Sequence, residues 1–314
     1  MKKQTKIAAV LSAAAFMMMV SGLPVYAASY GWVTEGDAKV YYDEDGYLTT
    51  DAWRKRGEDW FYLGEDGQIV KSKKIDEYYV DDEGKMVTNA WVELKNEEDP
   101  DSPETPDTFW YYFEKDGKSA VSKWVKFDSK WYYFDESGHM ATGKTEIDGA
   151  TYYLGTEKDG FMRTGWIRLE ENSHAPGASE SWYYFNSDGK MVTTQYDKKI
   201  DGSYYTFIDG KMQTGWVLMP SKSDVTDSNA ASPRITDYQY YGAAGDGKRA
   251  EGFRSIEGIS GIHAADEVYT FYFKAGKPYV SDKKGNSLFT INAKKYAFSD
   301  LGIMQTGRQI ANVA

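Results

Sequence analysis

The sequence contains no cysteine and few of the aliphatic residues that usually build a core. Among its 314 residues there are 10 Leu, 14 Ile and three scattered His. The absence of cysteine excludes disulfides, thiolate nucleophiles and Cys-ligated metals. No pair of histidines has the spacing of a zinc site, and no serine stands in a recognisable nucleophile motif. We therefore expect neither a metal nor a cofactor.

Positive charge and long apolar runs are also scarce. The chain has 37 basic against 48 acidic residues, a formal net charge of −11. An acidic chain is poorly suited to the phosphate backbone, so we expect no nucleic-acid partner. Beyond the N-terminal segment no run is apolar enough to cross a bilayer, and we expect no membrane span.

The N-terminal segment has the order of a secretory signal. Lys2, Lys3 and Lys6 precede an apolar stretch, and small residues before and at Ala27 suit a cleavage site. The apolar stretch of about 14 residues falls short of the ~20 that a transmembrane helix needs. The sequence thus predicts a signal peptide over residues 1–27 and a secreted mature protein of residues 28–314.

Aromatic residues are abundant and recur in order. The chain has 26 Tyr, 14 Phe and 10 Trp. They gather in eleven clusters, which begin at residues 41, 60, 78, 110, 131, 152, 182, 204, 240, 271 and 296. A glycine follows each cluster, and in six repeats a Met lies two residues beyond that glycine. The undisturbed period is about 20 residues, which indicates a repeat architecture.

The repeat unit has the chemistry of a β-hairpin. A run such as residues 131–134 alternates between the two faces of a strand, and the Asp-Gly or Ser-Gly that follows suits a tight hairpin turn. A lone two-stranded hairpin is marginal, but stacked hairpins bury their rings against one another.

We therefore predict an all-β fold, an elongated solenoid of eleven stacked β-hairpin repeats with negligible helix. Residues 31–195 conform well to the repeat and residues 196–314 diverge. Polar insertions at 96–107, 170–181 and 220–237 are predicted surface loops. Since the repeats leave no stretch long enough for a catalytic domain, we expect no enzyme.

The motif resembles a known family. Residues 130–134 read Lys-Trp-Tyr-Tyr-Phe, and residues 138–143 read Gly-His-Met-Ala-Thr-Gly. This pattern is similar to the choline-binding, or cell-wall-binding, repeat of Gram-positive bacteria, and related repeats occur in glucan-binding proteins and large clostridial toxins. The resemblance covers essentially all of residues 28–314. It implies a left-handed superhelix of hairpins, ligand sites between consecutive repeats, and association with the cell wall.

The resemblance also implies the kind of site. Choline is a quaternary ammonium, held by aromatic faces because it cannot donate a conventional hydrogen bond. The family's cage uses the Trp before the hairpin, the Trp that opens the triplet, and a Tyr from the next repeat, with Met nearby. Four repeats have both Trp positions: Trp53/Trp60, Trp91/Trp110, Trp124/Trp131 and Trp166/Trp182.

Strand alternation places the third triplet residue on the same face as the opening Trp, so we expect it to be the Tyr that the next repeat supplies. The preferred candidate is Trp124, Trp131 and Tyr153, with Met140 nearby, because no insertion interrupts it. The other candidates are Trp166, Trp182 and Tyr205, and Trp91, Trp110 and Tyr133. Any one of these rings could instead pack in the core.

Three functions remain open. The first is attachment to a choline-bearing cell-wall polymer such as choline-substituted teichoic acid, which the double-Trp repeats favour. The second is binding of a glucan-type glycan by stacking sugars on Trp and Tyr, which the loss of the double Trp after residue 196 favours. The third is a surface adhesin whose acidic inserted loops bind a host or partner protein.

Overall fold

A computed structural model describes residues 30–96, 106–170, 180–220, 232–243, 245–264 and 266–307. The predicted signal peptide and most of each predicted insertion lie outside these residues. The chain divides into two compact units, residues 1–120 and residues 121–314. Each unit is described by itself, and the single solenoid that we expect over residues 28–314 stays a prediction.

The described residues of both units consist almost entirely of short strands. The first unit contains β1 (Gly31–Glu35), β2 (Ala38–Tyr42), β3 (Ala52–Arg56), β4 (Asp59–Leu63), β5 (Lys73–Ile75), β6 (Tyr78–Val80), β7 (Ala90–Lys95) and β8 (Thr108–Phe113). The second unit begins with β9 (Lys123–Phe127), β10 (Lys130–Phe134), β11 (Lys144–Ile147), β12 (Ala150–Tyr153), β13 (Gly165–Glu170), β14 (Glu180–Phe185), β15 (Gln195–Ile200), β16 (Ser203–Ile208) and β17 (Lys211–Met212).

The second unit continues with β18 (Gly215–Leu218), β19 (Tyr238–Tyr241), β20 (Gly252–Glu257), β21 (Val268–Lys274), β22 (Lys277–Pro278), β23 (Asn286–Ile291), β24 (Lys294–Ser299) and β25 (Met304–Gln305). A single 3₁₀ turn, η1 (Ile235–Asp237), is the helical segment of the described residues. The all-β prediction is confirmed.

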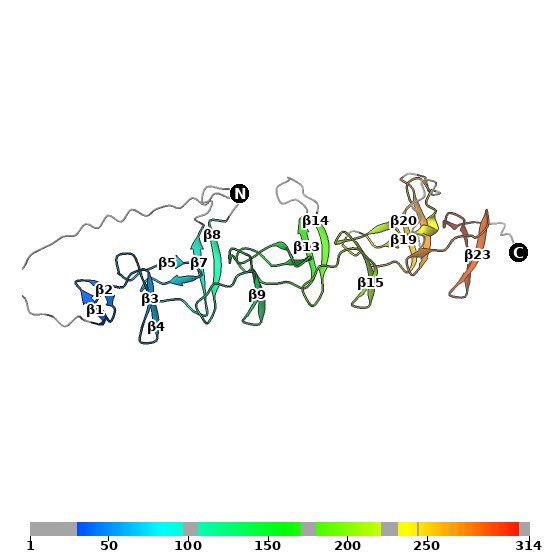
Figure 1. Cartoon of the computed structure of the whole chain (residues 1–314). Coiled ribbons are helices and arrows are strands. Elements are labelled where there is room, and N and C mark those ends of the chain that lie inside the picture. The colour runs from blue at the N-terminus through cyan, green and yellow to red at the C-terminus, as the bar shows by residue number, and fades with distance from the viewer. Residues whose placement is uncertain are drawn as a thin grey trace, which may run out of the picture. The chain divides into compact units, whose positions relative to one another are not determined.

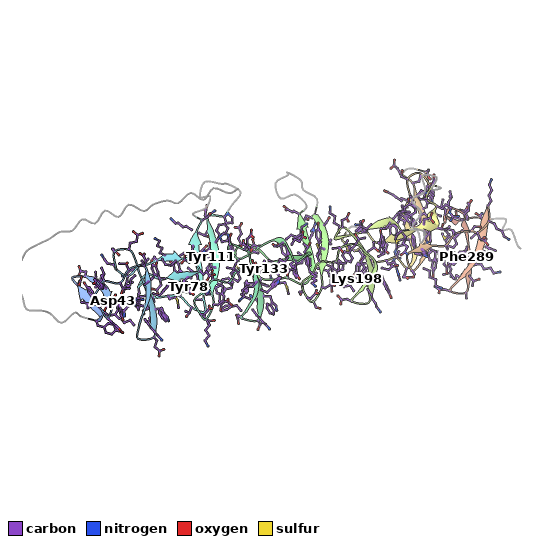
Figure 2. The ribbon with its side chains drawn as sticks, in the orientation of Figure 1. Asp43, Tyr78, Tyr111, Tyr133, Lys198 and Phe289 are labelled. Carbon is purple, nitrogen blue, oxygen red and sulfur yellow. The ribbon has the colours of Figure 1, made fainter. Side chains whose placement is uncertain are left out.

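The strands form antiparallel hairpins that follow one another in chain order within each unit (Figure 1). Eleven separate sheets of two or three strands lie in the described ranges, and each aromatic cluster occupies one strand of its own sheet. In Figure 2, for example, the labelled Tyr78 and Tyr111 lie on strands β6 and β8. The eleven repeats predicted from the aromatic spacing are therefore present as eleven hairpins.

Each repeat has two turns, one between its two main strands and one at the recurring glycine after the aromatic cluster. Between β16 and β17, Asp209 and Gly210 form the second turn with φ of 50° and 83°, so the predicted positive φ at this glycine is confirmed there. In the β9–β10 hairpin, Asp128 and Ser129 form the turn with φ of 46° and 65°, as a type I′ turn requires. Gly138 follows β10, and its N–H donates to the carbonyl of Asp135 at 3.1 Å. That second turn brings the chain back so that Met140 pairs with Phe134.

The core contains one fully buried residue from most repeats, which lies at the end of the aromatic cluster or just after it. It is Phe134 in the β9–β10 repeat and Phe185 in the β13–β14 repeat, both 0% exposed. The equivalent residues that are also fully buried are Leu63, Val80, Phe113, Leu154, Phe207, Tyr241, Phe273 and Phe298. Each repeat thus adds one small piece to a narrow core, as expected of a repeat protein.

Methionines join neighbouring repeats by packing on the recurring glycines. A Cβ placed on Gly117 would lie 2.7 Å from the Sδ of Met86, which belongs to the preceding repeat. The same overlap recurs in four pairs of the second unit: Met140 with Gly160, Met162 with Gly189, Met191 with Gly210, and Met212 with Gly247. These glycines have positive φ and also leave room for the Met, so two requirements select the same residue.

Candidate ligand-binding site

In several hairpins the lead ring, usually a Trp, contacts two rings, one in its own repeat and one in the next. The ring of Trp166 lies 5.1 Å from that of Tyr184, directly across the hairpin, and 4.8 Å from that of Tyr205. Trp124 likewise lies 5.3 Å from Tyr133 and 5.0 Å from Tyr152. The next-repeat partners of the other lead rings are Phe61 for Trp32, Tyr78 for Trp53, Phe271 for Trp216 and Tyr296 for Phe253.

These contacts correct the expected source of the third ring. The third triplet residue packs within its own hairpin, since it lies opposite the lead Trp of the same repeat. The second triplet residue points to the other face, where it meets the preceding repeat. The ring against Trp124 is therefore Tyr152, whereas Tyr153 lies 6.2 Å from Phe185. Tyr205 follows the same rule, because Thr206 takes the third place in its strand.

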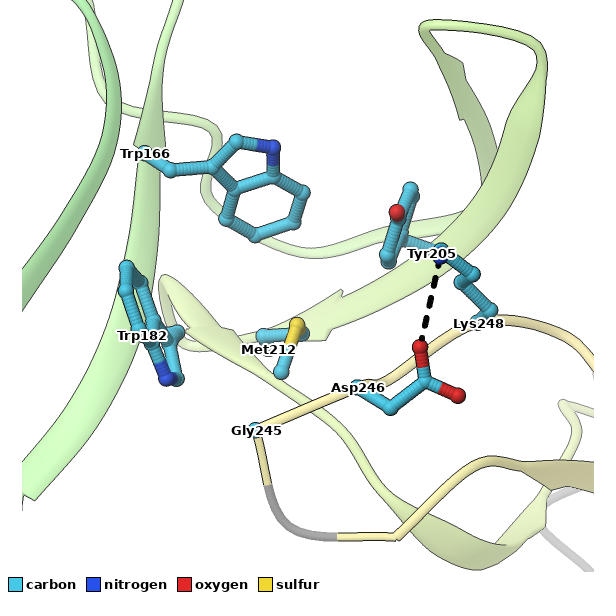
Figure 3. A pocket seen from close by; sticks show the side chains of 7 residues that line it. All are labelled: Trp166, Trp182, Tyr205, Met212, Gly245, Asp246 and Lys248. Carbon is cyan, nitrogen blue, oxygen red and sulfur yellow. Dashed lines mark ion pairs between the residues drawn. The ribbon is translucent and has the colours of Figure 1, made fainter.

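Trp166, Trp182 and Tyr205 line a pocket of about 300 Å³ in the second unit (Figure 3). Met212, which follows Tyr205 in the same sheet, completes its apolar wall. The rings of Trp166 and Trp182 stand nearly perpendicular, at 83°, with centroids 6.4 Å apart. This volume lies at the lower end of the range for small-molecule sites, and suits a small ligand enclosed by ring faces.

Two charged side chains stand at the rim of this pocket. Asp246 and Lys248 come from the turn that follows β19, and the Nζ of Lys248 lies 3.5 Å from a carboxylate oxygen of Asp246 (Figure 3). Both side chains are more than half exposed, so the attraction between them is weak. On the opposite strand from Trp182, Arg168 pairs with Glu180. A cation in the pocket would meet ring faces, with the Asp246 carboxylate and the Lys248 ammonium both at the rim.

The preferred candidate from the sequence, Trp124 with Trp131, is more open. Trp131 is 41% exposed, and the Nζ of Lys126 already lies over its ring, 5.8 Å from the centroid. Trp124 and Met162, which belongs to the following repeat, both pack against the buried cluster around Tyr152, while Met140 packs against Gly160. The chain's own cation therefore competes for the ring face that a ligand would use.

The candidate of Trp91, Trp110 and Tyr133 has its members in different units. Trp91 and Trp110 belong to the first unit, where their rings lie 6.4 Å apart at 73°. Tyr133 belongs to the second unit, where it packs on Trp124. The two Trp rings thus repeat the geometry of the Trp166–Trp182 pair, and their use as a site stays a prediction.

The β18–β19 repeat, after residue 196, keeps the lead Trp and lacks the second one. Trp216 packs on Phe271 at 5.1 Å and on Phe273 at 5.4 Å, and its indole N–H donates to the carbonyl of Glu257 at 3.0 Å. Trp166 makes the equivalent ring contacts with Tyr205 and Phe207. Tyr238 stands opposite Leu218 at the place where Trp182 stands opposite Arg168, so the second Trp is the ring that this repeat lacks.

A buried polar network lies beside the pocket. The hydroxyl of Tyr241 accepts a hydrogen bond from Thr206 at 2.7 Å and donates to Asp197 at 2.9 Å. Asp197 in turn pairs with the guanidinium of Arg249 at 2.9 Å. Burial raises the pKa of the Tyr241 hydroxyl above its usual value, because the phenolate would be desolvated. The hydroxyl stays protonated at neutral pH and holds Asp197 in place.

The sequence did not reveal Met212, Asp246 and Lys248 as site residues. The sequence shows Met212 as one of the six Met that follow the recurring glycine, but the two Trp of its pocket belong to the preceding repeat. Asp246 and Lys248 come from the turn two repeats after Trp166, so a pattern read within single repeats does not connect them. Within the described ranges, no three His, Asp or Glu side chains cluster as metal ligands. No helix of the described residues is long and apolar enough to span a membrane.

Two family models match the part of the second unit that builds these sites. Residues 121–166 match the model described as a choline-binding repeat, and residues 178–191 match the model described as a putative cell wall binding repeat. The segment that matches the choline-binding repeat includes Trp124, Trp131 and Trp166, and the segment that matches the putative cell wall binding repeat includes Trp182.

Two curated relatives from streptococci are similar over most of the chain. Glucosyltransferase-S of Streptococcus mutans is 27% identical over 261 residues, which are 77% of this chain and 14% of that protein. Glucosyltransferase-I of Streptococcus downei is 26% identical over 301 residues, 86% of this chain and 18% of that protein. The chain thus spans less than a fifth of the length of these relatives, and the likeness concerns its repeats.

Solved structures from Streptococcus pneumoniae share the fold of these hairpin repeats. The modular autolysin LytC superposes with a TM-score of 0.52 at 21% identity, over 88% of this chain and 53% of that chain. CbpJ superposes with a TM-score of 0.52 at 20% identity, over 88% of this chain and 94% of that chain. The hairpin repeats are therefore a fold already seen in experimental structures.

Proposed function

We propose that this protein is a secreted, non-catalytic binding protein that attaches to choline-bearing polymers of a Gram-positive cell wall. The pocket of Trp166, Trp182, Tyr205 and Met212 carries the proposal, because it offers ring faces and a thioether to a small cation. The match of residues 178–191 to a putative cell wall binding repeat supports the cell-wall location. The signal peptide expected at residues 1–27 would supply the export route.

The chemistry of the pocket favours a quaternary ammonium. Each ring face contributes about 0.5–2 kcal/mol to a bound cation, depending on how far it is desolvated. Three rings, one thioether and the carboxylate of Asp246 together give a weak single site. Useful affinity for a polymer then comes from several sites on one chain, since a second contact on the same polymer is intramolecular.

The test is a titration of the full chain with choline chloride, followed by tryptophan fluorescence and calorimetry. We expect Trp182→Ala to weaken choline binding roughly 5- to 30-fold, the loss of about 1–2 kcal/mol of ring contact. Trp182→Phe keeps a ring face and should retain most of the affinity, which separates ligand contact from folding. Trp131→Ala is the matched control at the other Trp pair, and should change the affinity of the main site little.

Two results would contradict the proposal. One is saturable choline binding that Trp182→Ala leaves unchanged in a variant with an unaltered circular dichroism spectrum. The other is the absence of any choline binding by the folded full chain. Elution of the protein from a choline-analogue (DEAE-type) resin by free choline provides an independent readout.

A glycan remains the second candidate function. Trp60 and Trp131 are 40% and 41% exposed, more than a packing role requires, and flat exposed indoles are the surfaces on which sugars stack. Two relatives of the chain are named glucosyltransferases. Retention of the full chain on immobilised dextran, lost in a Trp60→Ala, Trp131→Ala double variant, would support this function.

A further inference from the structure

The ion pair of Asp246 and Lys248 lies between two cavities. Both side chains line the aromatic pocket described above, and both also line a second cavity of about 330 Å³. Tyr205 lines the first cavity and Tyr204 the second, so the two cavities lie on opposite faces of strand β16. The turn that carries Asp246 and Lys248 connects them.

The second cavity is basic where the first is aromatic. Lys248, Arg249 and Arg254 line it, together with Asp246 and Glu251. Arg249 stands two residues after Gly247, the place that Met212 takes after Gly210. Its Cγ packs on Gly276, 2.7 Å from where a Cβ would lie, as the methionines pack on glycines elsewhere. One repeat beyond the aromatic pocket, a guanidinium therefore replaces the thioether.

The cations of this cavity differ in how firmly they are held. Arg249 is held by Asp197 at 2.9 Å and lies over the ring of Tyr204 at 4.1 Å. Arg254 is exposed and, within the described residues, has no carboxylate within 4 Å; one of its nitrogens donates to the carbonyl of Phe253. Lys248 has only the exposed contact with Asp246. Arg254 and Lys248 are thus the cations available to a ligand.

The carboxylates of the region are not arranged to cancel these cations. A carboxylate oxygen of Glu251 accepts a hydrogen bond from the backbone N–H of Ala275 at 2.8 Å, which orients that side chain. Asp246 lines the aromatic pocket as well as the second cavity, so it can turn to a cation there. A ligand cation beside Asp246 would free Lys248 to pair with an anion on the other side.

We propose that these two cavities form one bipartite site for a zwitterion, in which the aromatic pocket holds a quaternary ammonium and Lys248 with Arg254 holds an oxyanion. When the ligand binds, the Asp246–Lys248 ion pair is replaced by two others. Asp246 pairs with the quaternary ammonium, and Lys248 pairs with the oxyanion. The site therefore distinguishes a quaternary ammonium that is joined to a phosphate or carboxylate from choline alone. This inference rests on the proposed function, because it needs the aromatic pocket to hold the cation.

The experiment compares choline chloride with choline phosphate by calorimetry on the full chain at low salt. We expect choline phosphate to bind about 3- to 10-fold more tightly, the scale of one or two exposed ion pairs. The preference should shrink in 0.5 M NaCl, because salt screens exposed charges. Lys248→Gln should remove the preference for choline phosphate. Arg254→Gln, at a residue that lines the second cavity and not the aromatic pocket, should reduce the preference and leave choline affinity close to that of the wild type.

Lys283→Gln is the matched control, since Lys283 is an exposed lysine of the same unit that lines neither cavity. It should keep the full preference. Trimethylglycine, a quaternary ammonium with a carboxylate, separates the two sources of the oxyanion. If the Lys248-dependent preference appears with choline phosphate alone, the oxyanion is a phosphate; if it appears with trimethylglycine alone, the oxyanion is a carboxylate.

The outcomes distinguish the two proposals. Equal affinities for choline, choline phosphate and trimethylglycine in the wild type would overturn the bipartite site and leave the aromatic pocket standing. A preference that persists in Lys248→Gln would also overturn it. Failure of all three ligands to bind the folded chain would overturn the proposed function together with this inference.

Discussion

The packing of methionine on glycine between repeats makes a sharp prediction about stability. Gly189 and Gly202 have nearly the same positive φ, 80° and 83°. A Cβ on Gly202 would meet no heavy atom within 4 Å. A Cβ on Gly189 would overlap Met162, lying 2.7 Å from its Cγ and 3.0 Å from its Cε. Substitution by Ala therefore imposes the same backbone strain at both sites, and a steric overlap at only one.

The expected magnitudes follow from these two causes. An L-residue in the left-handed region costs about 1–2 kcal/mol, and Gly202→Ala should lower the free energy of unfolding by that amount. Overpacking adds about 1–3 kcal/mol, so Gly189→Ala should cost about 2–5 kcal/mol in total. The Cγ of Met162 is one bond from its Cβ, so the overlap is not relieved by moving the end of the side chain alone.

The assay is urea unfolding of both variants, followed by circular dichroism and by tryptophan fluorescence. Met162→Ala supplies the decisive cross-check, because it removes the atoms that Gly189→Ala would overlap. In that background Gly189→Ala should cost no more than Gly202→Ala does. Equal costs for the two substitutions in the wild-type chain would refute the idea that the neighbouring methionine selects this glycine.

Two further predictions concern ionisable groups. Tyr241→Phe should lower the free energy of unfolding by about 1–3 kcal/mol, because Thr206 and Asp197 lose a buried partner. The raised pKa of Tyr241 stabilises the fold below about pH 10, and that stabilisation is lost as pH rises further; the variant should show a smaller alkaline loss of urea midpoint, and an unchanged loss would contradict the assignment. The backbone N–H of Thr156 lowers the pKa of Asp159, with Arg163 adding to the effect. That stabilisation is present above about pH 4 and lost as pH falls below it, so thermal melts of Asp159→Asn should depend less on pH between 3 and 5 than those of the wild type.

The repeat number and the β-hairpin class could be predicted from the sequence because they depend on local chemistry. Eleven aromatic clusters gave eleven hairpins, since each cluster fills one strand whatever its neighbours do. Trp166, Trp182 and Tyr205 were also predicted as one group, and the structure brings them into one pocket. Whether that pocket binds choline stays a prediction.

The contacts between repeats were harder to predict because they depend on which face of a strand meets the neighbour. Strand alternation places the third triplet residue on the same face as the opening Trp. It does not predict that this residue packs against the lead Trp of its own hairpin. Tyr152 was missed at the Trp124 pair for this reason. Asp246 and Lys248 lie about 80 residues after Trp166, and only the three-dimensional stacking connects them to it.

The contact between each lead ring and the next repeat means that a binding pocket belongs to a junction and not to a repeat. Removing residues 195–214 would place the β18–β19 hairpin directly after the Trp166 hairpin. The β18–β19 hairpin has Gln239 at the position that Tyr205 takes in the deleted repeat. The new neighbour would also bring Arg249 where Met212 had been, and the pocket would lose a ring and a thioether at once. Gains and losses of single repeats in such a chain therefore change ligand chemistry even when every remaining hairpin keeps its sequence.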